Sequence, residues 1–384
     1  WNMDIYVVEK GDTVDSIAAG YGIMAERIIA VNQIEYPYRL AVGQALLILT
    51  EEEANVESDK REISVNGYAY PFIRNWILRQ TLPYLTDLSV FSYGFTFEGE
   101  LIYPLVSDDW MLSLSGEFGT RPILTLTPFG PDGNFNNQLI HSVVRNPEYS
   151  SRLIGNLLEV MREKGYVGVD IDFEFILAED RDYFTDFVRN VTETMNDNGY
   201  TASVALAPKT SATQQGLLYE GKDYKALGEA ANSVLLMTYE WGYTYGPPMA
   251  VAPLNMVRRV IEYAVTEIDN RKIDMGIPNY GYDWPLPYTR GQTKATTIGN
   301  IEAVQIAINN NAVIMFDETA QSPYFRYNVN GTEHEVWFED IRSINAKFNL
   351  LEEFNLRGAG YWTIMQWFKP NWELLNYRFK IKGQ

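Results

Sequence analysis

The sequence has no cysteine and contains two histidines, His141 and His334, among its 384 residues. The absence of cysteine excludes disulfides, thiolate nucleophiles and cysteine-ligated metal sites. A zinc site of the usual kind would need both histidines together with a carboxylate. We interpret both histidines as structural or surface residues, and we expect neither a metal nor a cofactor.

Long apolar runs and positive charge are also scarce. No run approaches 18 apolar residues, and the first residues lack a basic segment followed by an apolar one, so neither a membrane span nor a signal peptide is visible. The net charge of −19 argues against binding to nucleic acid or to an anionic membrane. We therefore expect no nucleic-acid or membrane partner, and we expect the protein to act as a monomer.

What the chain does contain is apolar and aromatic residues, at 46% and 14% of the sequence, which indicates a packed protein. Its length allows two domains. The first is predicted at residues 3–50, as a short strand, a helix capped by Asp12 or Thr13 and ended by Gly20 or Gly22, a second helix and a second strand.

This βααβ unit resembles a LysM domain, because "YVVEKGDTVDSIAAGYGI", then Asn32 with Ile34, then "LAVGQALLIL" stand in the expected order. The resemblance implies binding to glycans that contain N-acetylglucosamine, such as peptidoglycan or chitin. It also implies which residues bind, namely Gly11, Asp12 and Thr13 together with Asn32 and Ile34. A small domain without a ligand is the alternative.

A charged segment without apolar periodicity, residues 51–62, predicts a linker to a second domain at residues 63–380. There, eight β-rich apolar runs alternate with helical patterns, which favours a (β/α)8 TIM barrel over a doubly wound open sheet. The region from about 284 to 350 is too long for one crossover, so we expect a small inserted hairpin there. The eight runs are residues 63–70, 88–95, 122–128, 165–175, 200–208, 233–240, 272–281 and 358–367.

The run "GVDIDFEF" at residues 168–175 places three acids on one face of a strand and apolar residues on the other. In a barrel, the acids Asp170, Asp172 and Glu174 would point into the lumen and climb toward the C-terminal rim, where barrel active sites lie. Acids this close and partly desolvated cannot all be charged cheaply, so at least one should have a raised pKa and serve as a general acid. A solvated acidic face and a divalent-metal site are the alternatives.

The spacing of these acids narrows the reaction class. A retaining glycosidase of the common type needs two carboxyl groups on opposite sides of the scissile bond, whereas residues two apart on a strand lie on the same side. The nucleophile would then come from elsewhere. One solution is the 2-acetamido group of the substrate, with Asp172 supporting the amide and Glu174 protonating the leaving oxygen.

Residues 63–380 resemble a glycoside hydrolase family 18 domain, whose motif Asp-x-x-Asp-x-Asp-x-Glu stands here as "VGVDIDFE". The last three acids of the motif correspond to Asp170, Asp172 and Glu174, and the first is replaced by Val167. The resemblance implies a catalytic role for the three acids, with Glu174 as the proton donor.

Other family positions follow from the same resemblance. "LLMTYEWG" supplies Met237 and Tyr239, and the tyrosine is expected to donate a hydrogen bond to the acetamido oxygen. Glu240 stands where the family usually has aspartate. "GAGYWTIMQW" places Trp362 under the reacting sugar. Further candidates for stacking on sugar rings are Tyr93, Phe129, Trp241, Tyr282 and Trp284, although packing in the core or at the rim is the commoner role of such aromatics in a barrel.

The LysM unit together with "MTYEWGYTYGPPMAVAPL" and "GIPNYGYDWPLPY" resembles one subgroup, the spore cortical-fragment lytic enzymes. That resemblance implies an N-acetylglucosaminidase acting on peptidoglycan fragments, associated with the spore or cell wall of a spore-forming bacterium. Two alternatives stay open: a chitinase, and a barrel that binds glycan without cleaving it.

Overall fold

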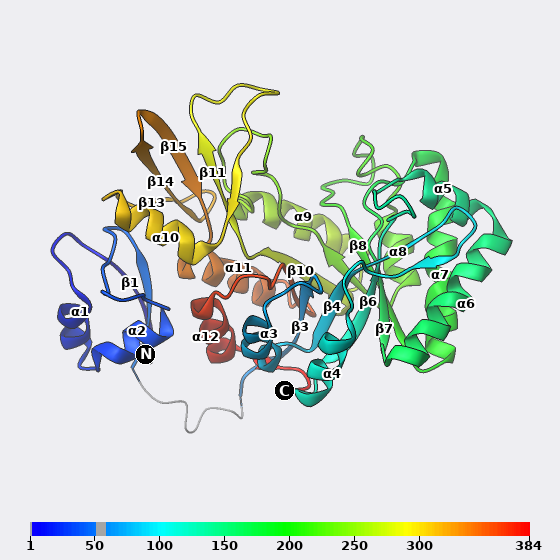
Figure 1. The fold of residues 1–384 in the computed structure, drawn as a ribbon, viewed down its shortest axis with the longest axis horizontal. Helices are drawn as coiled ribbons and strands as arrows, with labels where there is room; N and C mark the ends of the chain where they lie inside the picture. Colours follow the sequence, from blue (N-terminus) through cyan, green and yellow to red (C-terminus); the bar gives the residue numbers. More distant parts are fainter. Residues whose placement is uncertain (1, 51–58) are drawn as a thin grey trace.

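The computed structural model describes residues 2–50 and 59–384 (Figure 1). The N-terminal unit pairs β1 (Met3–Val7) antiparallel with β2 (Ala45–Leu49), and α1 (Val14–Tyr21) and α2 (Ala25–Val31) lie between them in the chain. Helix α1 begins at a capping box formed by Thr13 and Ser16 and ends at Gly22, whose φ of 68° favours glycine. Thr13 and Gly22 are thus the residues that cap the predicted helix.

The rest of the chain is built on a closed parallel barrel of eight strands. This confirms the predicted TIM barrel and excludes the open sheet, because the first strand pairs with both the second and the last. The strands are β3 (Glu62–Ala69), β4 (Asp87–Phe95), β6 (Arg121–Leu126), β7 (Gly168–Ile171), β8 (Thr201–Leu206), β9 (Ser233–Leu236), β10 (Ile273–Pro278) and β16 (Gly358–Trp362). The expected linker at 51–62 falls mostly outside the described residues, and Glu62 already belongs to β3.

Helices surround the barrel (Figure 1). They are α3 (Asn75–Thr81), α4 (Asp109–Glu117), α5 (Gln138–Arg145), α6 (Pro147–Lys164), α7 (Arg181–Asp197), α8 (Tyr224–Ala230), α9 (Leu254–Glu267), α11 (Ile341–Glu353) and α12 (Lys369–Arg378). Two short strands extend the sheet, β5 (Leu101–Ile102) against β4 and β17 (Lys380–Ile381) against β3. In the described part of the chain, no helix is both long and apolar enough to cross a membrane.

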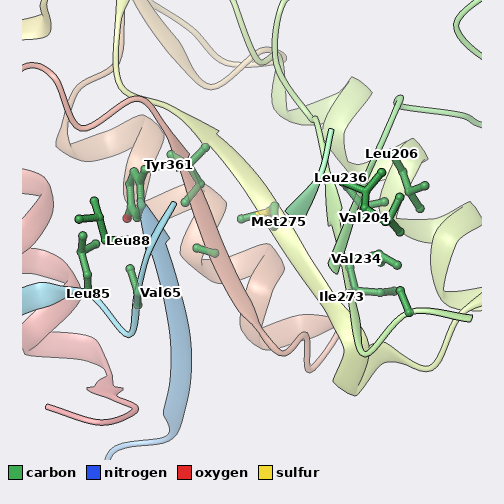
Figure 2. Close-up of a cluster of buried hydrophobic side chains, with 14 of the residues drawn as sticks. Val65, Leu85, Leu88, Val204, Leu206, Val234, Leu236, Ile273, Met275 and Tyr361 are labelled. Carbon is green, nitrogen blue, oxygen red and sulfur yellow. The ribbon is translucent and has the colours of Figure 1, made fainter. Parts of the chain in front are cut away.

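The main core lies between the outer face of the barrel and these helices. Outward-pointing side chains alternate with lumen-facing ones along each strand, as the pleat requires. Figure 2 shows part of this layer, in which apolar residues of neighbouring strands gather side by side. The labelled residues that lie on barrel strands are Val65, Leu88, Val204, Leu206, Val234, Leu236, Ile273, Met275 and Tyr361.

The insertion between β10 and α11 is larger than the predicted hairpin. The hairpin itself is present as β14 (Ser322–Val329) and β15 (Thr332–Trp337), joined at Asn330 and Gly331. It belongs to a five-stranded antiparallel sheet of order β12-β11-β15-β14-β13. The other strands of this sheet are too short to show the alternation of apolar and polar residues by which a strand is predicted. The added elements are β11 (Gly281–Pro285), β12 (Thr296–Ile298), α10 (Asn300–Asn309) and β13 (Met315–Asp317).

The N-terminal unit is docked on the second domain. The side-chain amide of Gln33 donates to the carbonyl oxygen of Trp367 at 3.2 Å and accepts from the backbone N–H of Lys369 at 2.9 Å. On the insertion, the N–H of Ile314 donates to the carbonyl oxygen of Val42 at 2.8 Å. Leu47 of β2 joins the main hydrophobic core. The two domains therefore share a packed interface.

Candidate active site

Asp170 lies in the barrel lumen and is held from two other strands. The hydroxyl of Tyr68 in β3 donates to its Oδ2 at 2.6 Å, and the hydroxyl of Ser203 in β8 donates to its Oδ1 at 2.8 Å. The predictions did not include these two partners. Both occupy lumen-facing positions of their strands, so strand alternation combined with the barrel prediction could have found them.

The acid ladder continues beyond the end of the regular strand. Strand β7 ends at Ile171, but the N–H of Asp172 still donates to the carbonyl oxygen of Leu126 at 2.9 Å. Phe173 is fully buried and stacks on Phe187 of α7, with ring centroids 5.9 Å apart. Because the alternation persists, Asp172 and Glu174 stay on the side of Asp170.

Burial raises the pKa values of all three acids. For Asp172, burial and then the negative charges of Asp170 and Glu174 raise the pKa to about 7. Glu174 is the exposed member of the three, and removal from bulk water is still the main cause of its raised pKa. At least one acid of the ladder therefore retains a proton near neutrality, which is the condition for a general acid.

A pocket of about 140 Å³ brings Glu174 together with residues that follow β9. The pocket lies where the C-terminal ends of the parallel strands meet, at the rim expected for a barrel enzyme. Its lining comprises Glu174, Ala207, Pro208, Leu218, Tyr219, Met237, Tyr239, Glu240 and Trp241. Four of the sequence candidates, Met237, Tyr239, Glu240 and Trp241, thus lie around the proton donor.

The hydroxyl of Tyr239 is placed to donate to a ligand. Burial and then the charges of Asp172 and Asp170 raise its pKa well above the ordinary value, so it keeps its proton. Its ring packs against β10 at Gly276, where a Cβ would lie 2.8 Å from a ring carbon. In the structure as described, no hydrogen-bond partner occupies this hydroxyl.

Glu240, which also lines the pocket, is held in place by two hydrogen bonds. The hydroxyls of Tyr280 and Tyr282 both donate to its Oε1, at 2.6 and 2.7 Å. Its φ of 69° is in the left-handed region, which is strained for a non-glycine residue and is found preferentially at functional sites. Sequence reasoning missed Tyr280 and gave Tyr282 a role in stacking. The buried ring of Tyr282 instead orients the carboxylate.

Trp362, at the end of β16, forms part of an aromatic floor in the barrel mouth. Its ring centroid is 4.9 Å from that of Phe91 and 5.5 Å from that of Tyr68. Trp362 also packs against the aromatic cluster that contains Tyr280 and Tyr282. The same rings therefore connect the predicted sugar floor to Asp170 through Tyr68 and to Glu240 through the two tyrosines.

The predicted stacking role is wrong for two residues. Tyr93 and Trp284 are fully buried, at 0% exposure, so their rings cannot contact a sugar. The hydroxyl of Tyr93 donates to Asp108, and the indole N–H of Trp284 donates to the carbonyl oxygen of Gly246 at 2.8 Å. Phe129 lies against the exposed ring of Phe135, with centroids 5.9 Å apart.

The structure divides the predicted LysM residues into two groups. Gly11 and Thr13 are exposed, and Asp12 shapes their loop by accepting hydrogen bonds from the Tyr6 hydroxyl and the Glu9 N–H, each at 2.7 Å. These three residues are accessible to a ligand.

Asn32 and Ile34 form the other group, and their predicted glycan contact is corrected. The Asn32 amide donates to the carbonyl oxygens of Ile28 and Leu47 and accepts from the Leu47 N–H. Both residues are buried and line a cavity of about 30 Å³ between the LysM unit and the second domain.

The two histidines pair with acids outside the pocket. Nδ1 of His141 lies 2.7 Å from Oδ2 of Asp180, whose other oxygen accepts from Nε of Arg145 at 2.5 Å. Nδ1 of His334 lies 2.8 Å from Oδ1 of Asp283. Among the described residues, His141 with Glu179 and Asp180 is the cluster compact enough to hold a metal, and Asp180 is already engaged there.

The pocket thus combines the carboxyl of Glu174 with the phenol of Tyr239, and Asp172 lies on the same side as Glu174, whereas Trp362 lies outside the described lining. The pocket can protonate a leaving oxygen and hold an amide-bearing sugar, and it contains no histidine or cysteine. These are elements of acid-catalysed glycoside cleavage.

Comparison with known proteins agrees with this chemistry. The family model "Glycosyl hydrolases family 18" matches residues 129–366, and the LysM domain model matches residues 6–48. A cortical fragment-lytic enzyme of Bacillus subtilis (strain 168) is 40% identical over 428 aligned positions, covering 99% of each chain. The protein of the same name from Bacillus anthracis is 36% identical, with 99% of each chain covered.

Solved structures give the same answer. The spore cortex-lytic enzyme SleL of Bacillus cereus is 33% identical and has a TM-score of 0.94, covering 100% of this chain and 99% of that chain. SleL of Bacillus megaterium QM B1551 is also 33% identical, with a TM-score of 0.93 and the same coverage. The chain therefore belongs to family 18 of the glycosyl hydrolases and carries a LysM domain ahead of its barrel.

Proposed function

We propose that the protein is an N-acetylglucosaminidase that cleaves spore-cortex peptidoglycan fragments with retention of configuration, using the acetamido group of the substrate as the nucleophile. The relatives named above as cortical fragment-lytic and spore cortex-lytic enzymes support the substrate, since they align over almost the whole chain. The proposal places the protein at the spore or cell wall.

The state of the carboxylates around the pocket carries the mechanism. Glu174 faces the pocket from the end of β7, and Asp172 lies behind it on the same side. Glu240, the other carboxylate among the described lining residues, accepts at Oε1 from two tyrosine hydroxyls. The described lining therefore offers one proton donor and no unrestrained second carboxylate, so the substrate is left to supply the nucleophile.

The bond changes follow from these positions. The acetamido carbonyl oxygen attacks the anomeric carbon while Glu174 gives its proton to the departing glycosidic oxygen. Asp172, ionised, accepts a hydrogen bond from the amide N–H, and the Tyr239 hydroxyl donates to the acetamido oxygen and orients it. Glu174, now a carboxylate, removes a proton from the water that opens the cyclic intermediate, and this returns the original configuration.

The LysM domain anchors the enzyme on insoluble glycan through the exposed loop at residues 11–13. Because the domain is docked on the barrel through Gln33 and Val42, an anchored glycan would hold the barrel in a defined orientation. Effective concentration then raises the rate at which the barrel meets neighbouring chains.

Product analysis tests the catalytic proposal. Wild type and Glu174→Gln are incubated with spore-cortex fragments and with chitin oligomers, and products are identified by mass spectrometry. We expect wild type to release fragments ending in N-acetylglucosamine from cortex, and the variant to release almost none. No release by wild type would refute the enzyme assignment, and cleavage of chitin alone would refute the cortex assignment.

A matched pair of LysM variants tests the anchor. Asp12→Ala removes the acceptor that shapes the loop, whereas Asp15→Ala removes an exposed acid from the first turn of α1. We expect Asp12→Ala to reduce sedimentation with insoluble peptidoglycan, Asp15→Ala to sediment like wild type, and both to turn over short soluble fragments normally. Equal sedimentation of all three proteins would remove the anchoring role.

A further inference from the structure

Lys222 is a charged residue that the proposed mechanism does not use. It lies in the segment between β8 and α8 and is fully buried, at 0% exposure. Its ammonium donates to the carbonyl oxygen of Ala205 at 3.2 Å and makes no direct ion pair within the described chain. A buried ammonium is costly unless nearby negative charge compensates it.

The backbone brings Lys222 to the level of the catalytic acids. Val204 in β8 pairs with Ile171 in β7, so Ala205, which binds the ammonium, stands beside Asp172 in the barrel. The preceding residue, Gly221, packs against Ile176, two positions after Glu174. A Cβ at Gly221 would lie 2.4 Å from Ile176, so glycine is what permits this approach.

The surroundings leave Asp172 and Glu174 as the compensating charges. The aromatic face of Phe184 from α7 lies 5.7 Å from the nitrogen of Lys222. Asp172 and Glu174 both favour the charged form of Lys222, although burial, the larger effect, lowers its pKa to about 8. In return, the charge of Lys222 opposes the rise in pKa of both acids.

Among the described residues, the other titratable groups that line the pocket or act on the acid pair are acids and phenols. They are Asp170 in β7, Tyr68 in β3, Tyr70 just after β3, Tyr219 between β8 and α8, and Tyr239 and Glu240 after β9. Lys209, after β8, is also buried, but its ammonium binds the carbonyl oxygen of Lys222 at 2.8 Å, and its charge is influenced by acids outside the pocket such as Asp223.

We propose that Lys222 is a positioning residue for the reaction, whose buried ammonium holds the acid pair Asp172 and Glu174 to one proton between them. The inference rests on the proposed function, because it assigns the pair one proton at working pH. Without the ammonium, the crowded acids would retain more protons, and Asp172 could no longer accept the substrate amide.

The test is the pH dependence of kcat/KM on soluble cortex fragments. In Lys222→Met, the acidic limb should move up by about one pH unit, because loss of the cation raises the pKa of the acid pair. Lys222→Arg keeps the charge and should keep the acidic limb of wild type. Lys209→Met, which removes the neighbouring buried lysine, should leave both limbs in place.

The outcomes separate the two proposals. If wild type is inactive, the proposed function fails. If wild type is active and Lys222→Met loses rate without any shift of the limbs, Lys222 is only structural and the inference is overturned. If Lys222→Met does not fold, Lys222→Arg decides the question. The guanidinium of the variant stays charged above pH 8, so the alkaline limb of its pH profile should lie at lower pH than that of wild type. Coincident alkaline limbs would overturn the inference.

Discussion

Both ends of the barrel lumen contain buried acids, but the two ends differ in the cations beside those acids. At the base, Asp274 accepts from Arg357 at 2.5 Å and Asp87 lies 3.4 Å from Arg121, around a cavity of about 70 Å³. At the rim, Asp172 and Glu174 have no arginine partner in the described chain, and Glu174 lines the pocket. Burial raises pKa values at both ends, but a guanidinium is fixed beside the acids at only one.

This difference suits the acids at the base to a structural role and the acids at the rim to proton transfer. Arg357 opposes the effect of burial on Asp274, whose pKa still rises to about 6. The acids at the rim instead feel the ammonium of Lys222 without a direct ion pair, so their proton is left available to a substrate. Val167 replaces the first acid of the family motif. At the base, Asp87 from β4 and Asp274 from β10 nevertheless add negative charge below Asp170.

The largest expected effect is at the rim. Glu174→Gln should lower kcat by about 10²- to 10⁴-fold, the usual contribution of a general acid, while the melting temperature stays close to that of wild type. Initial rates on cortex fragments and thermal unfolding measure the two quantities. Glu179→Gln changes an exposed glutamate five residues further on and should keep full activity. Equal losses in both variants would contradict the assignment.

The next effect is at the base. Arg357→Leu leaves the buried Asp274 carboxylate unpaired and should lower the free energy of unfolding by about 3–5 kcal/mol. Urea denaturation measures this change. The control is Arg271→Leu, which breaks an exposed pair with Asp269 and should leave the urea midpoint close to that of wild type. Similar losses in both variants would remove the structural role of the base.

A smaller effect distinguishes the two ends by pH. Burial and the neighbouring acids raise the pKa of Asp172 in the folded protein to about 7, so ionisation of Asp172 at high pH carries a free-energy penalty for the folded state. The stabilising contribution of the protonated carboxyl is complete below the pKa of the unfolded chain and is lost as the pH rises through 7. Asp172→Asn removes this penalty. The variant should therefore be more stable than wild type by about 1–2 kcal/mol at pH 8, and the gain should shrink toward pH 5. A pH-independent difference would contradict a raised pKa at Asp172.

Much of this site follows from local pattern. Alternation over residues 168–175 predicts the acidic and apolar faces, and the lumen position of Asp170 follows once a barrel is predicted. Capping chemistry narrows the ends of α1 to Asp12 or Thr13 and to Gly20 or Gly22, and the structure has Thr13 and Gly22 there. These features depend on neighbours within a few residues, and the sequence displays them directly.

The rest depends on tertiary contacts. Strand alternation places Tyr68 in the lumen, but its contact with Asp170, 102 positions away, follows only from the closed barrel. Lys222 lies in a segment without periodicity, so no local pattern points to its contact. Tyr93 and Asn32 have residue types that suit sugar binding, but they are buried by packing around Asp108 and Leu47. Burial of this kind is decided only when distant elements close on one another.

The nucleophile is the central claim, and a substituent series tests it directly. Aryl glycosides are prepared in which the acetyl group of the reacting N-acetylglucosamine carries zero, one, two or three fluorine atoms, and kcat/KM is measured for each. Fluorine withdraws electrons from the amide oxygen, so neighbouring-group attack predicts a rate that falls with every fluorine added. A rate that stays constant along the series would contradict the account and would point to a carboxylate of the protein, with Glu240 as the group to examine.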